Sequence, residues 1–225
     1  ISTIFPAVKA VGEELADRIF YLTAKTITAT VAKETFALLE KNGYRAKTIQ
    51  ITAKEKLCPC DEMECNPVTC PYAKGHFDRV NDAVFDLLHR CEMIERDDIL
   101  SQADRYTVCP FELCLDTASW CDNIICDYNY VFDPNVYLKR FFQEGIKGDY
   151  IFLIDEAHNM VERSRQMYSA QIYKEDFLTV KRIMKEHSRS IEKALEKCNK
   201  ILLGMKRECE NYTVYDTFGN MVFSF

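Results

Sequence analysis

The 225 residues carry a formal net charge of −6 and are 48% apolar, which is enough for one large domain or two small domains with a sizeable core. The sequence contains neither a secretory signal pattern nor a run of about 18 apolar residues, so we expect a soluble, cytoplasmic protein rather than a secreted or membrane-spanning one. The acidic balance gives no general sign of a nucleic-acid partner, although a local basic groove on an acidic protein is compatible with one.

The N-terminal part alternates between helical and extended patterns. Ile1 to Leu15 has apolar residues at helical spacing, and Arg18 to Thr23 predicts a strand. A polar loop, Ala24 to Thr28, leads to a predicted helix over Val31–Lys41 and a predicted strand over Ala46–Thr52. This order of elements is typical of a parallel α/β domain.

The loop after the first predicted strand contains Thr23, Lys25 and Thr26. Threonine hydroxyls, backbone amides and a lysine at the carboxyl end of a strand can hold a phosphodiester backbone. An ordinary helix N-cap by Thr26 or Thr28 explains the same residues without a ligand, and it is the simpler interpretation of these residues taken alone.

The α/β order breaks at Ala53 and resumes after Cys109. The segment from Lys54 to Tyr72 is irregular and rich in cysteine and cannot build an apolar core, so something other than apolar packing must order it. A helix is predicted from His76 to about Met93, with one buried face made of Phe77, Val80, Val84, Leu87, Leu88 and Cys91. We therefore interpret Ala53–Cys109 as an insertion into a parallel-sheet domain.

The 11 cysteines are many for a cytosolic chain, where disulfides are rare, and all except Cys198 and Cys209 lie between Cys58 and Cys126. Four thiolates suit either a [4Fe–4S] cluster or a tetrahedral zinc ion. The paired C-x-x-C spacing of zinc sites is absent, and a cysteine followed by proline is typical of iron–sulfur loops. The spacing therefore favours iron–sulfur, with four candidate ligands: Cys58, Cys65, Cys70 and Cys109. Cys60 is an alternative to Cys58. The remaining cysteines of this region are predicted to be buried apolar side chains: Cys91, Cys114, Cys121 and Cys126.

The stretch YIFLIDEAHNM, Tyr150 to Met160, combines an apolar run with two adjacent acids. The run predicts a buried strand of a parallel sheet, and open α/β sheets bind ligands at the carboxyl ends of their strands. There Asp155 can hold Mg²⁺ through water, Glu156 can orient the water that attacks a γ-phosphate, and His158 can report the nucleotide state to a neighbouring domain. A buried strand followed by an acidic helical turn is the alternative explanation.

Regular elements are also predicted on either side of this stretch. Phe111 to Cys121 is helical in pattern, and Asn123 to Asp127 is extended. Beyond Asn159 the pattern predicts one long amphipathic helix or a helix pair. The residues from Val214 onward predict a strand or hairpin that turns at Gly219-Asn220.

Several of these motifs, in this order, resemble the DinG/XPD-type iron–sulfur DNA helicases of superfamily 2. The stretches that carry the resemblance are FYLTAKTIT (Phe20–Thr28), KEKLCPCDEMECNPVTCPYAKG (Lys54–Gly75), CPFELCLDTASWCDNIICDYNYVFDP (Cys109–Pro134) and FLIDEAHNM (Phe152–Met160). The resemblance implies an α/β fold with a partial RecA-like parallel sheet of the P-loop NTPase type. Residues 1–52 and 110–165 would form motor domain 1, residues 53–109 an iron–sulfur insert, and residues 166–225 the start of a helical arch.

The resemblance also implies roles for individual residues. The four candidate cysteines would ligate a [4Fe–4S] cluster, Asp155 would hold Mg²⁺, Glu156 would activate water, and His158 would couple hydrolysis to movement. Contacts to the DNA backbone would come from the loop residues Thr23, Lys25 and Thr26. Base stacking by tyrosines is a further possibility, with packing as the simpler explanation for each: Tyr72, Tyr128 and Tyr130.

The implied function is ATP-dependent 5′–3′ unwinding of DNA at a junction of single and double strands, in repair or replication. The 225 residues contain no G-x-x-x-x-G-K-[ST] phosphate loop and no second motor domain. We therefore expect a fragment of a longer helicase polypeptide that does not hydrolyse ATP by itself. A non-enzymatic nucleic-acid-binding module with structural zinc is the alternative.

Overall fold

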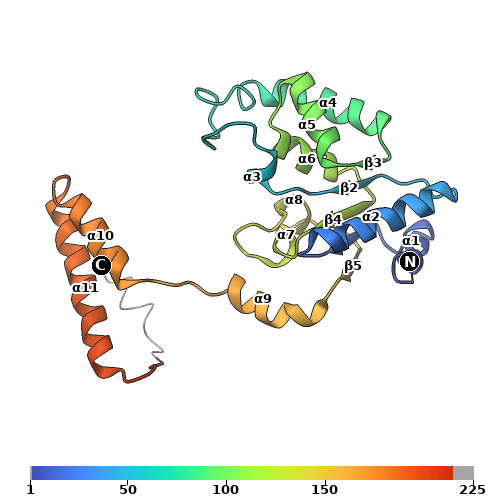
Figure 1. Ribbon diagram of the computed structural model, residues 1–225. Helices are drawn as coiled ribbons and strands as arrows, with labels where there is room; N and C mark the ends of the chain where they lie inside the picture. The colour runs from blue at the N-terminus through green and yellow to red at the C-terminus, as the bar shows by residue number, and fades with distance from the viewer. Residues whose placement is uncertain (1, 215–225) are drawn as a thin grey trace. The chain divides into compact units, whose positions relative to one another are not determined.

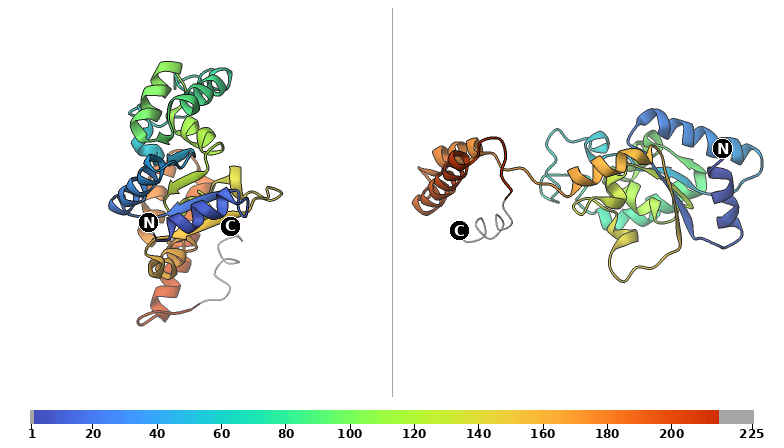
Figure 2. Two further views of the ribbon diagram at one scale, coloured as in Figure 1. Left: turned by 90° about the vertical axis from the view of Figure 1, so that its right-hand side faces the viewer. Right: turned by 90° about the horizontal axis from the view of Figure 1, so that it is seen from below.

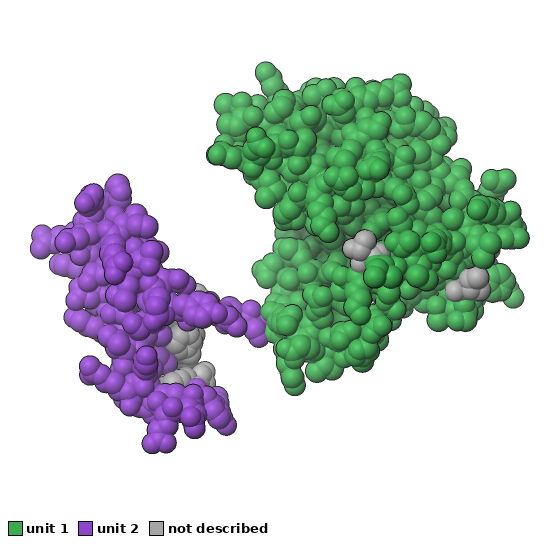
Figure 3. All heavy atoms as spheres, in the orientation of Figure 1, with its two compact units in different colours: residues 1–168 green, residues 169–225 purple. Residues whose placement is uncertain are grey.

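The computed structural model describes residues 2–214, and the structural statements below concern these residues. The predicted hairpin around Gly219-Asn220 lies outside them. The chain divides into two compact units, residues 1–168 and residues 169–225, which are coloured separately in Figure 3.

The first unit is built on a parallel sheet whose five described strands follow the order β3-β2-β4-β1-β5 (Figure 1). The strands are β1 Arg18–Leu22, β2 Thr48–Gln50, β3 Met93–Ile94, β4 Asn123–Cys126 and β5 Tyr150–Ile154. Leu22 is paired with Cys126 on one side and with Ile154 on the other. Three neighbouring strands therefore end at the same level, and the predicted α/β class with a parallel sheet is confirmed.

Helices cover both faces of this sheet. Their bounds are α1 Ile4–Gly12, α2 Thr26–Lys41, α3 Lys54–Leu57, α4 His76–Arg90, α5 Arg96–Tyr106, α6 Pro110–Ala118, α7 Asn129–Phe132, α8 Lys139–Phe142 and α9 Met160–Met167. Buried residues of α1 and α2 pack with Ile125 on one face, whereas α4, α5 and α6 lie together and pack with Ile124 on the other (Figures 1 and 2). Successive strand residues point to opposite faces, which gives the sheet two apolar surfaces to cover.

Aromatic side chains fix the segment before β5 against the sheet. Phe20 is fully buried, and its ring centroid lies 5.2–5.5 Å from those of Phe141, Phe142, Tyr150 and Phe152. Edge-to-face and offset contacts of this kind stabilise by about 0.5–1.5 kcal/mol beyond the area they bury. The cluster holds β5 in register, and with it the acids that follow.

The strand β5 is half-buried rather than buried, which corrects the sequence-based prediction. It forms the edge of the sheet made by the described residues, and Phe152 on it is 39% exposed. An apolar run is expected to be buried, but one side of β5 has no neighbouring strand within residues 2–214. The chain order of the strands could not reveal this position.

Two predicted helical faces also need correction. Phe77 is 85% exposed, because the buried face of α4 is rotated around the helix axis toward His76 and Ala83, away from the predicted face. Phe5 is exposed although it lies within α1, and Leu15 is exposed because α1 ends at Gly12, before the predicted helix end. The helix α2 begins at Thr26, five residues before its predicted start, so most of the predicted loop is helical.

The cysteine-rich region contributes to the common core of the first unit. The strand β3 pairs with β2, and buried residues of α4 and α5 join the same apolar cluster as β1 and β4. Only the segment between α3 and α4 lacks regular structure. Residues 53–109 therefore supply strand β3 to the sheet and helices to its apolar core, and apolar contacts anchor both ends of the region.

The second unit contains a helix pair, α10 Lys174–Met184 and α11 Arg189–Glu208, rather than one long helix. An ion pair joins them, with Lys181 Nζ 3.4 Å from Glu196 Oε2. None of the described side chains on these two helices is fully buried. No helix within residues 2–214 is long and apolar enough to cross a membrane.

Candidate functional site

The carboxyl ends of three adjacent strands bring the predicted site residues to one edge of the sheet. Thr23 follows β1, Asp127 follows β4 and Asp155 follows β5. The Thr23 amide donates to the Cys126 carbonyl oxygen at 2.9 Å, and the Asp155 amide donates to the Leu22 carbonyl oxygen at 2.9 Å. The parallel ladder thus continues one residue beyond the strands and sets the spacing of these side chains.

A cavity of about 290 Å³ lies at this edge. It is lined by Thr23, Ala24, Lys25, Tyr128, Asp155, Glu156, Asn159, Glu162, Arg163 and Gln166. Both acids of the stretch Asp155–His158 and the lysine of the loop therefore face one space, although Lys25 and Asp155 are 130 positions apart in the chain. A cavity with carboxylates and a lysine at strand ends suits a magnesium-bound phosphate group.

The two acids differ in their surroundings. Asp155 Oδ2 is buried and has no hydrogen-bond partner among the described residues. Glu156 has φ +52° and ψ +42°, in the left-handed region that non-glycine residues rarely adopt, and it precedes a short 3₁₀ helix, Ala157–Asn159. His158 Nε2 lies 3.4 Å from Glu156 Oε2. A buried carboxylate oxygen without a partner is available to a cation, directly or through water.

The loop from Thr23 to Thr28 is organised by its own hydroxyl groups. Thr23 Oγ1 accepts a hydrogen bond from the Lys25 amide at 3.2 Å and shares another with Thr28 Oγ1. Thr28 Oγ1 also lies 3.0 Å from the Lys25 carbonyl oxygen. Lys25 occupies the N-cap position of α2, so the N-cap by Thr26 or Thr28 expected from the sequence is wrong. The side chain of Thr26 lies outside the described part of the structure.

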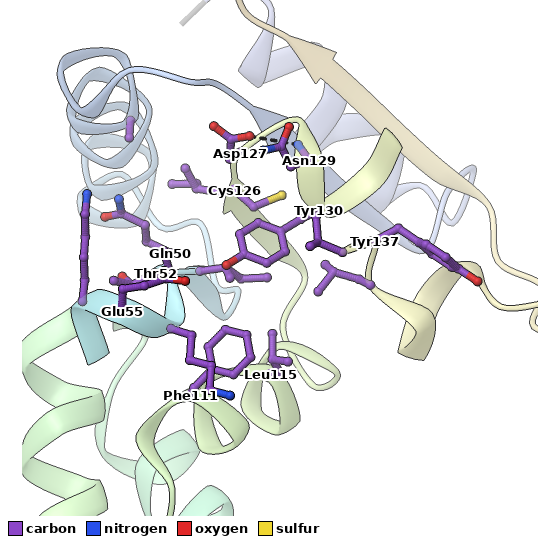
Figure 4. A pocket seen from close by; sticks show the side chains of 18 of the residues that line it. Gln50, Thr52, Glu55, Phe111, Leu115, Cys126, Asp127, Asn129, Tyr130 and Tyr137 are labelled. Carbon is purple, nitrogen blue, oxygen red and sulfur yellow. Dashed lines mark hydrogen bonds between the residues drawn. The ribbon is translucent and has the colours of Figure 1, made fainter. Parts of the chain in front are cut away.

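A larger cavity of about 1060 Å³ adjoins the same loop (Figure 4). Its lining includes six basic side chains, Lys25, Lys54, Lys56, Arg96, Lys139 and Arg140, and three acidic ones, Glu55, Glu112 and Asp127. Figure 4 shows the side chains of Phe111, Leu115 and Tyr130 inside it. Burial raises the pKa of Tyr130 to about 12. The cavity is therefore lined by apolar side chains and by more basic than acidic ones.

Of the three tyrosines considered for base stacking, one is placed where it cannot stack. Tyr128 is 1% exposed, and its hydroxyl donates to the Asp155 carbonyl oxygen. Tyr130 lines the larger cavity, and Tyr72 lies half-buried beside the cysteine-rich loop. The hydrogen bond explains why Tyr128 occurs here, and neither composition nor spacing could have indicated it.

Two cysteines of the irregular loop, Cys60 and Cys70, lie close together. Cys60 Sγ lies 3.9 Å from Cys70 Sγ, and burial together with the thiols of Cys70 and Cys58 raises the pKa of Cys60 to about 11. A hydrogen bond with Cys65 raises the pKa of Lys54, and the charges of Cys65, Cys109 and Cys58 add to this effect.

The donor chemistry of this segment fits an iron–sulfur cluster or zinc. Within residues 2–214, however, no three His, Cys, Asp or Glu side chains are close enough to hold a metal ion.

Cys109 is held by a histidine that the sequence did not single out. His76 is 4% exposed, and its Nδ1 accepts a hydrogen bond from the Cys109 amide at 3.2 Å. Its Nε2 lies 3.9 Å from Asp116 Oδ2. Cys109 itself occupies the N-cap position of α6, directly before Pro110 at the first helical position. The only available signal was a histidine at the start of an amphipathic helix, which is too common to be informative.

The other cysteines behave mostly as predicted. Cys114, Cys121 and Cys126 are buried, whereas Cys91 is half-buried at the end of α4. Burial raises the pKa of Cys114 and of Cys121 to about 12. These thiols are therefore inert apolar side chains at neutral pH. All eleven cysteines lie among the described residues, and all are free thiols.

Comparison with known proteins agrees with this geometry. The family model named DEAD_2 matches residues 30–177. A stretch of 108 residues is 32% identical to the general transcription and DNA repair factor IIH helicase subunit XPD/RAD3 of Saccharomyces cerevisiae, covering 48% of this chain and 13% of that protein. A stretch of 76 residues is 28% identical to the Fanconi anemia group J protein homolog of Gallus gallus, covering 34% of this chain and 6% of that protein.

The chain thus spans a small part of each of these relatives. The family match covers the loop at Cys58–Cys70, most of the lining of the larger cavity and the stretch Asp155–His158, whereas the loop residues Thr23 and Lys25 lie just before it. It extends over more than half of the 225 residues. The chain belongs to the DEAD_2 family, which is the family of XPD/DinG-type helicases.

Proposed function

We propose that the chain is part of the first motor domain of an ATP-dependent 5′–3′ DNA helicase that separates strands in repair or replication. The observation that carries this proposal is the placement of Asp155 and Glu156 in one cavity with Lys25, at the carboxyl edge of a parallel sheet. Family membership supports it, because two relatives are named as a helicase subunit of a DNA repair factor and as a Fanconi anemia group protein.

In this proposal the two acids act on ATP. Asp155 would hold Mg²⁺ by its unpartnered oxygen, directly or through water, and Glu156 would orient and polarise the attacking water. When bound with ATP, Mg²⁺ supplies the positive charge that stabilises the transferring phosphoryl group. His158, 3.4 Å from Glu156, couples hydrolysis to movement of a neighbouring domain. The phosphate-gripping loop and the second motor domain belong to other parts of the same polypeptide.

Single-stranded DNA is proposed to contact the loop at Thr23, Lys25 and Thr26 and to pass along the larger cavity. The excess of lysine and arginine in that cavity supports the proposal, because phosphate contacts are made mainly by these side chains. Binding of this kind tolerates different sequences and weakens steeply with salt.

Residues 53–109 are proposed to bind a [4Fe–4S] cluster through Cys58, Cys65, Cys70 and Cys109. The chemistry of four thiols and the Cys-Pro step at Cys109-Pro110 support the assignment. The short distance between Cys60 and Cys70 keeps Cys60 as an alternative to Cys58. Residues 166–225 are proposed to begin a helical arch. Free thiols throughout agree with a reducing, cytoplasmic compartment.

The proposal is tested on the full-length polypeptide by measuring ATP hydrolysis with and without single-stranded DNA, and unwinding of duplexes with 5′ or 3′ tails. Single-stranded DNA should stimulate hydrolysis, and only 5′-tailed duplexes should be unwound. Glu156→Gln should bind ATP normally and hydrolyse it roughly 100-fold more slowly or worse. A wild-type protein that binds DNA, contains zinc and never hydrolyses ATP would instead be the non-enzymatic module.

A further inference from the structure

Tyr128 lies between the two cavities. Its neighbours Asp127, Asn129 and Tyr130 line the larger cavity, whereas Tyr128 itself lines the smaller one with Asp155 and Glu156. The side chain is 1% exposed and belongs to the main apolar cluster of the unit. Because it is enclosed in the core, the side chain moves only together with the backbone segment that contains it.

The hydroxyl of Tyr128 contacts the acid pair through the backbone. It donates a hydrogen bond to the carbonyl oxygen of Asp155, 27 positions away. That carbonyl belongs to the peptide bond that leads into Glu156, where φ is +52°. A left-handed conformation at a non-glycine residue persists only where surrounding contacts hold it, and this hydrogen bond is such a contact. It determines the plane of the peptide and hence the direction in which the Glu156 side chain leaves the backbone.

Other contacts restrict the movement of Tyr128 and of the turn around it. The guanidinium carbon of Arg163, on α9, lies 5.9 Å from the centre of the Tyr128 ring. The Asn129 amide donates to Asp127 Oδ1 at 2.9 Å, a contact drawn in Figure 4, and the Phe132 amide donates to the Tyr128 carbonyl oxygen at 2.9 Å. The first bond joins the two residues on either side of Tyr128, both of which line the larger cavity, and the second joins Tyr128 to the end of α7, so these contacts brace the turn.

We propose that Tyr128 is a positioning residue that makes the placement of Glu156 depend on occupancy of the larger cavity by a DNA strand. A strand that contacts Asn129 or Tyr130 shifts or stiffens the turn, and the Tyr128 hydroxyl passes this on to the Asp155–Glu156 peptide. The inference rests on the proposed function, because it assumes that Glu156 activates water and that the larger cavity receives the strand.

The test compares Tyr128→Phe with Tyr168→Phe in the full-length protein. Both changes remove only a hydroxyl group. Tyr168 serves as the control because its hydroxyl also donates to a backbone carbonyl oxygen, that of Phe132 in α7, at 3.4 Å. Tyr168 itself is 73% exposed. Tyr128→Phe should lower kcat of strand-stimulated ATP hydrolysis by roughly fivefold to tenfold, the effect of one hydrogen bond. The KM for ATP and the affinity for the strand should change by less than about twofold, because the variant keeps the contacts that bind the ground state and the transition state equally.

A second measurement does not depend on hydrolysis. The Asn159 amide donates to the Glu156 carbonyl oxygen at 2.9 Å, so its hydrogen exchange reports on the order of this turn. Single-stranded DNA should slow that exchange in the wild type and in Tyr168→Phe, but not in Tyr128→Phe.

A Tyr128→Phe variant with wild-type kcat and wild-type protection would overturn the inference while the proposed function stands. A wild-type protein without strand-stimulated hydrolysis would overturn both.

Discussion

The unpartnered oxygen of Asp155 gives a prediction in which stability and activity change in opposite directions. Asp155 Oδ2 is buried without a hydrogen-bond partner among the described residues. A buried polar atom in this state costs about 1–3 kcal/mol, and a charged one costs more. Asp155→Asn keeps the shape of the side chain but removes its charge. The free energy of unfolding without Mg²⁺ should therefore rise by about 1 kcal/mol.

The measurement is thermal unfolding of the 225-residue chain in EDTA. For a protein of this size, a gain of about 1 kcal/mol raises Tm by roughly 2–4 °C. Asp127→Asn is the matched control, because Asp127 Oδ1 accepts a hydrogen bond from the Asn129 amide at 2.9 Å and an amide oxygen accepts it equally well. Its Tm should stay within about 2 °C of the wild type.

Activity should respond in the opposite direction. In the full-length protein, loss of the Asp155 charge removes the group proposed to hold Mg²⁺, and ATP hydrolysis should fall by roughly 100-fold or more. A variant that is more stable but less active is expected when the original residue is retained for its chemistry although it lowers stability. If Asp155→Asn lowers Tm in EDTA, the carboxylate is serving a structural contact and the reasoning from its unpartnered oxygen is refuted.

Three other changes test other parts of the molecule. Cys65→Ser should abolish the iron content and visible absorbance of the anaerobically purified protein, because three thiolates do not complete the proposed site. Lys25→Gln should weaken single-stranded DNA binding for all sequences and reduce the slope of log affinity against log salt by about one. Hydrogen bonding by Gln102, and then the charge of Arg105, holds the pKa of Asp86 below its usual range. Asp86→Asn should therefore speed hydrogen exchange in α4 and α5 at neutral pH, with the difference from the wild type vanishing as pH falls through that pKa.

Each of the three has an outcome that would contradict it, and the first two also have a control variant. Cys91→Ser should retain all the iron, because Cys91 lies half-buried at the end of α4; a colourless, zinc-containing wild type would refute the cluster. Lys9→Gln, at an exposed position on α1, should leave the salt slope unchanged, and an unchanged slope for Lys25→Gln would remove Lys25 from the strand contacts. For Asp86→Asn, the direction of the pH dependence follows because the Asp86 carboxyl has a lower pKa in the folded state than in the unfolded state. A difference from the wild type that grows toward low pH would contradict it.

Local patterns were sufficient for most elements of the first unit. The strands over Arg18–Leu22, Asn123–Cys126 and Tyr150–Ile154 were predicted to within a residue or two, because each is a short apolar run bounded by polar residues. The helix at Pro110–Ala118 was recognisable for a similar local reason, with proline at its first position. Where the local pattern was ambiguous, as for the stripe on α4, the exposed position of Phe77 could not be foreseen.

Contacts between distant segments were beyond the reach of such patterns. The hydrogen bond from Tyr128 to Asp155 and that from Cys109 to His76 each join residues about 30 positions apart. The local sequence of a tyrosine beside an aspartate does not show whether its ring stacks on a ligand or is buried in the core. For Tyr128, packing in the core was the simpler of the two explanations, and it is the one that the structure shows.

The sequence by itself determined the chemistry available to this protein: adjacent acids after an apolar strand, clustered thiols, and a threonine–lysine loop. These are properties of neighbouring residues, and they were sufficient to indicate the family. Only the tertiary structure decided which of them share a cavity, because strand order and register place Lys25 beside Asp155 and leave β5 at the edge. Hydrogen bonding between parallel strands aligns segments that the chain keeps far apart, and this alignment brings the acids, the loop and Tyr128 together.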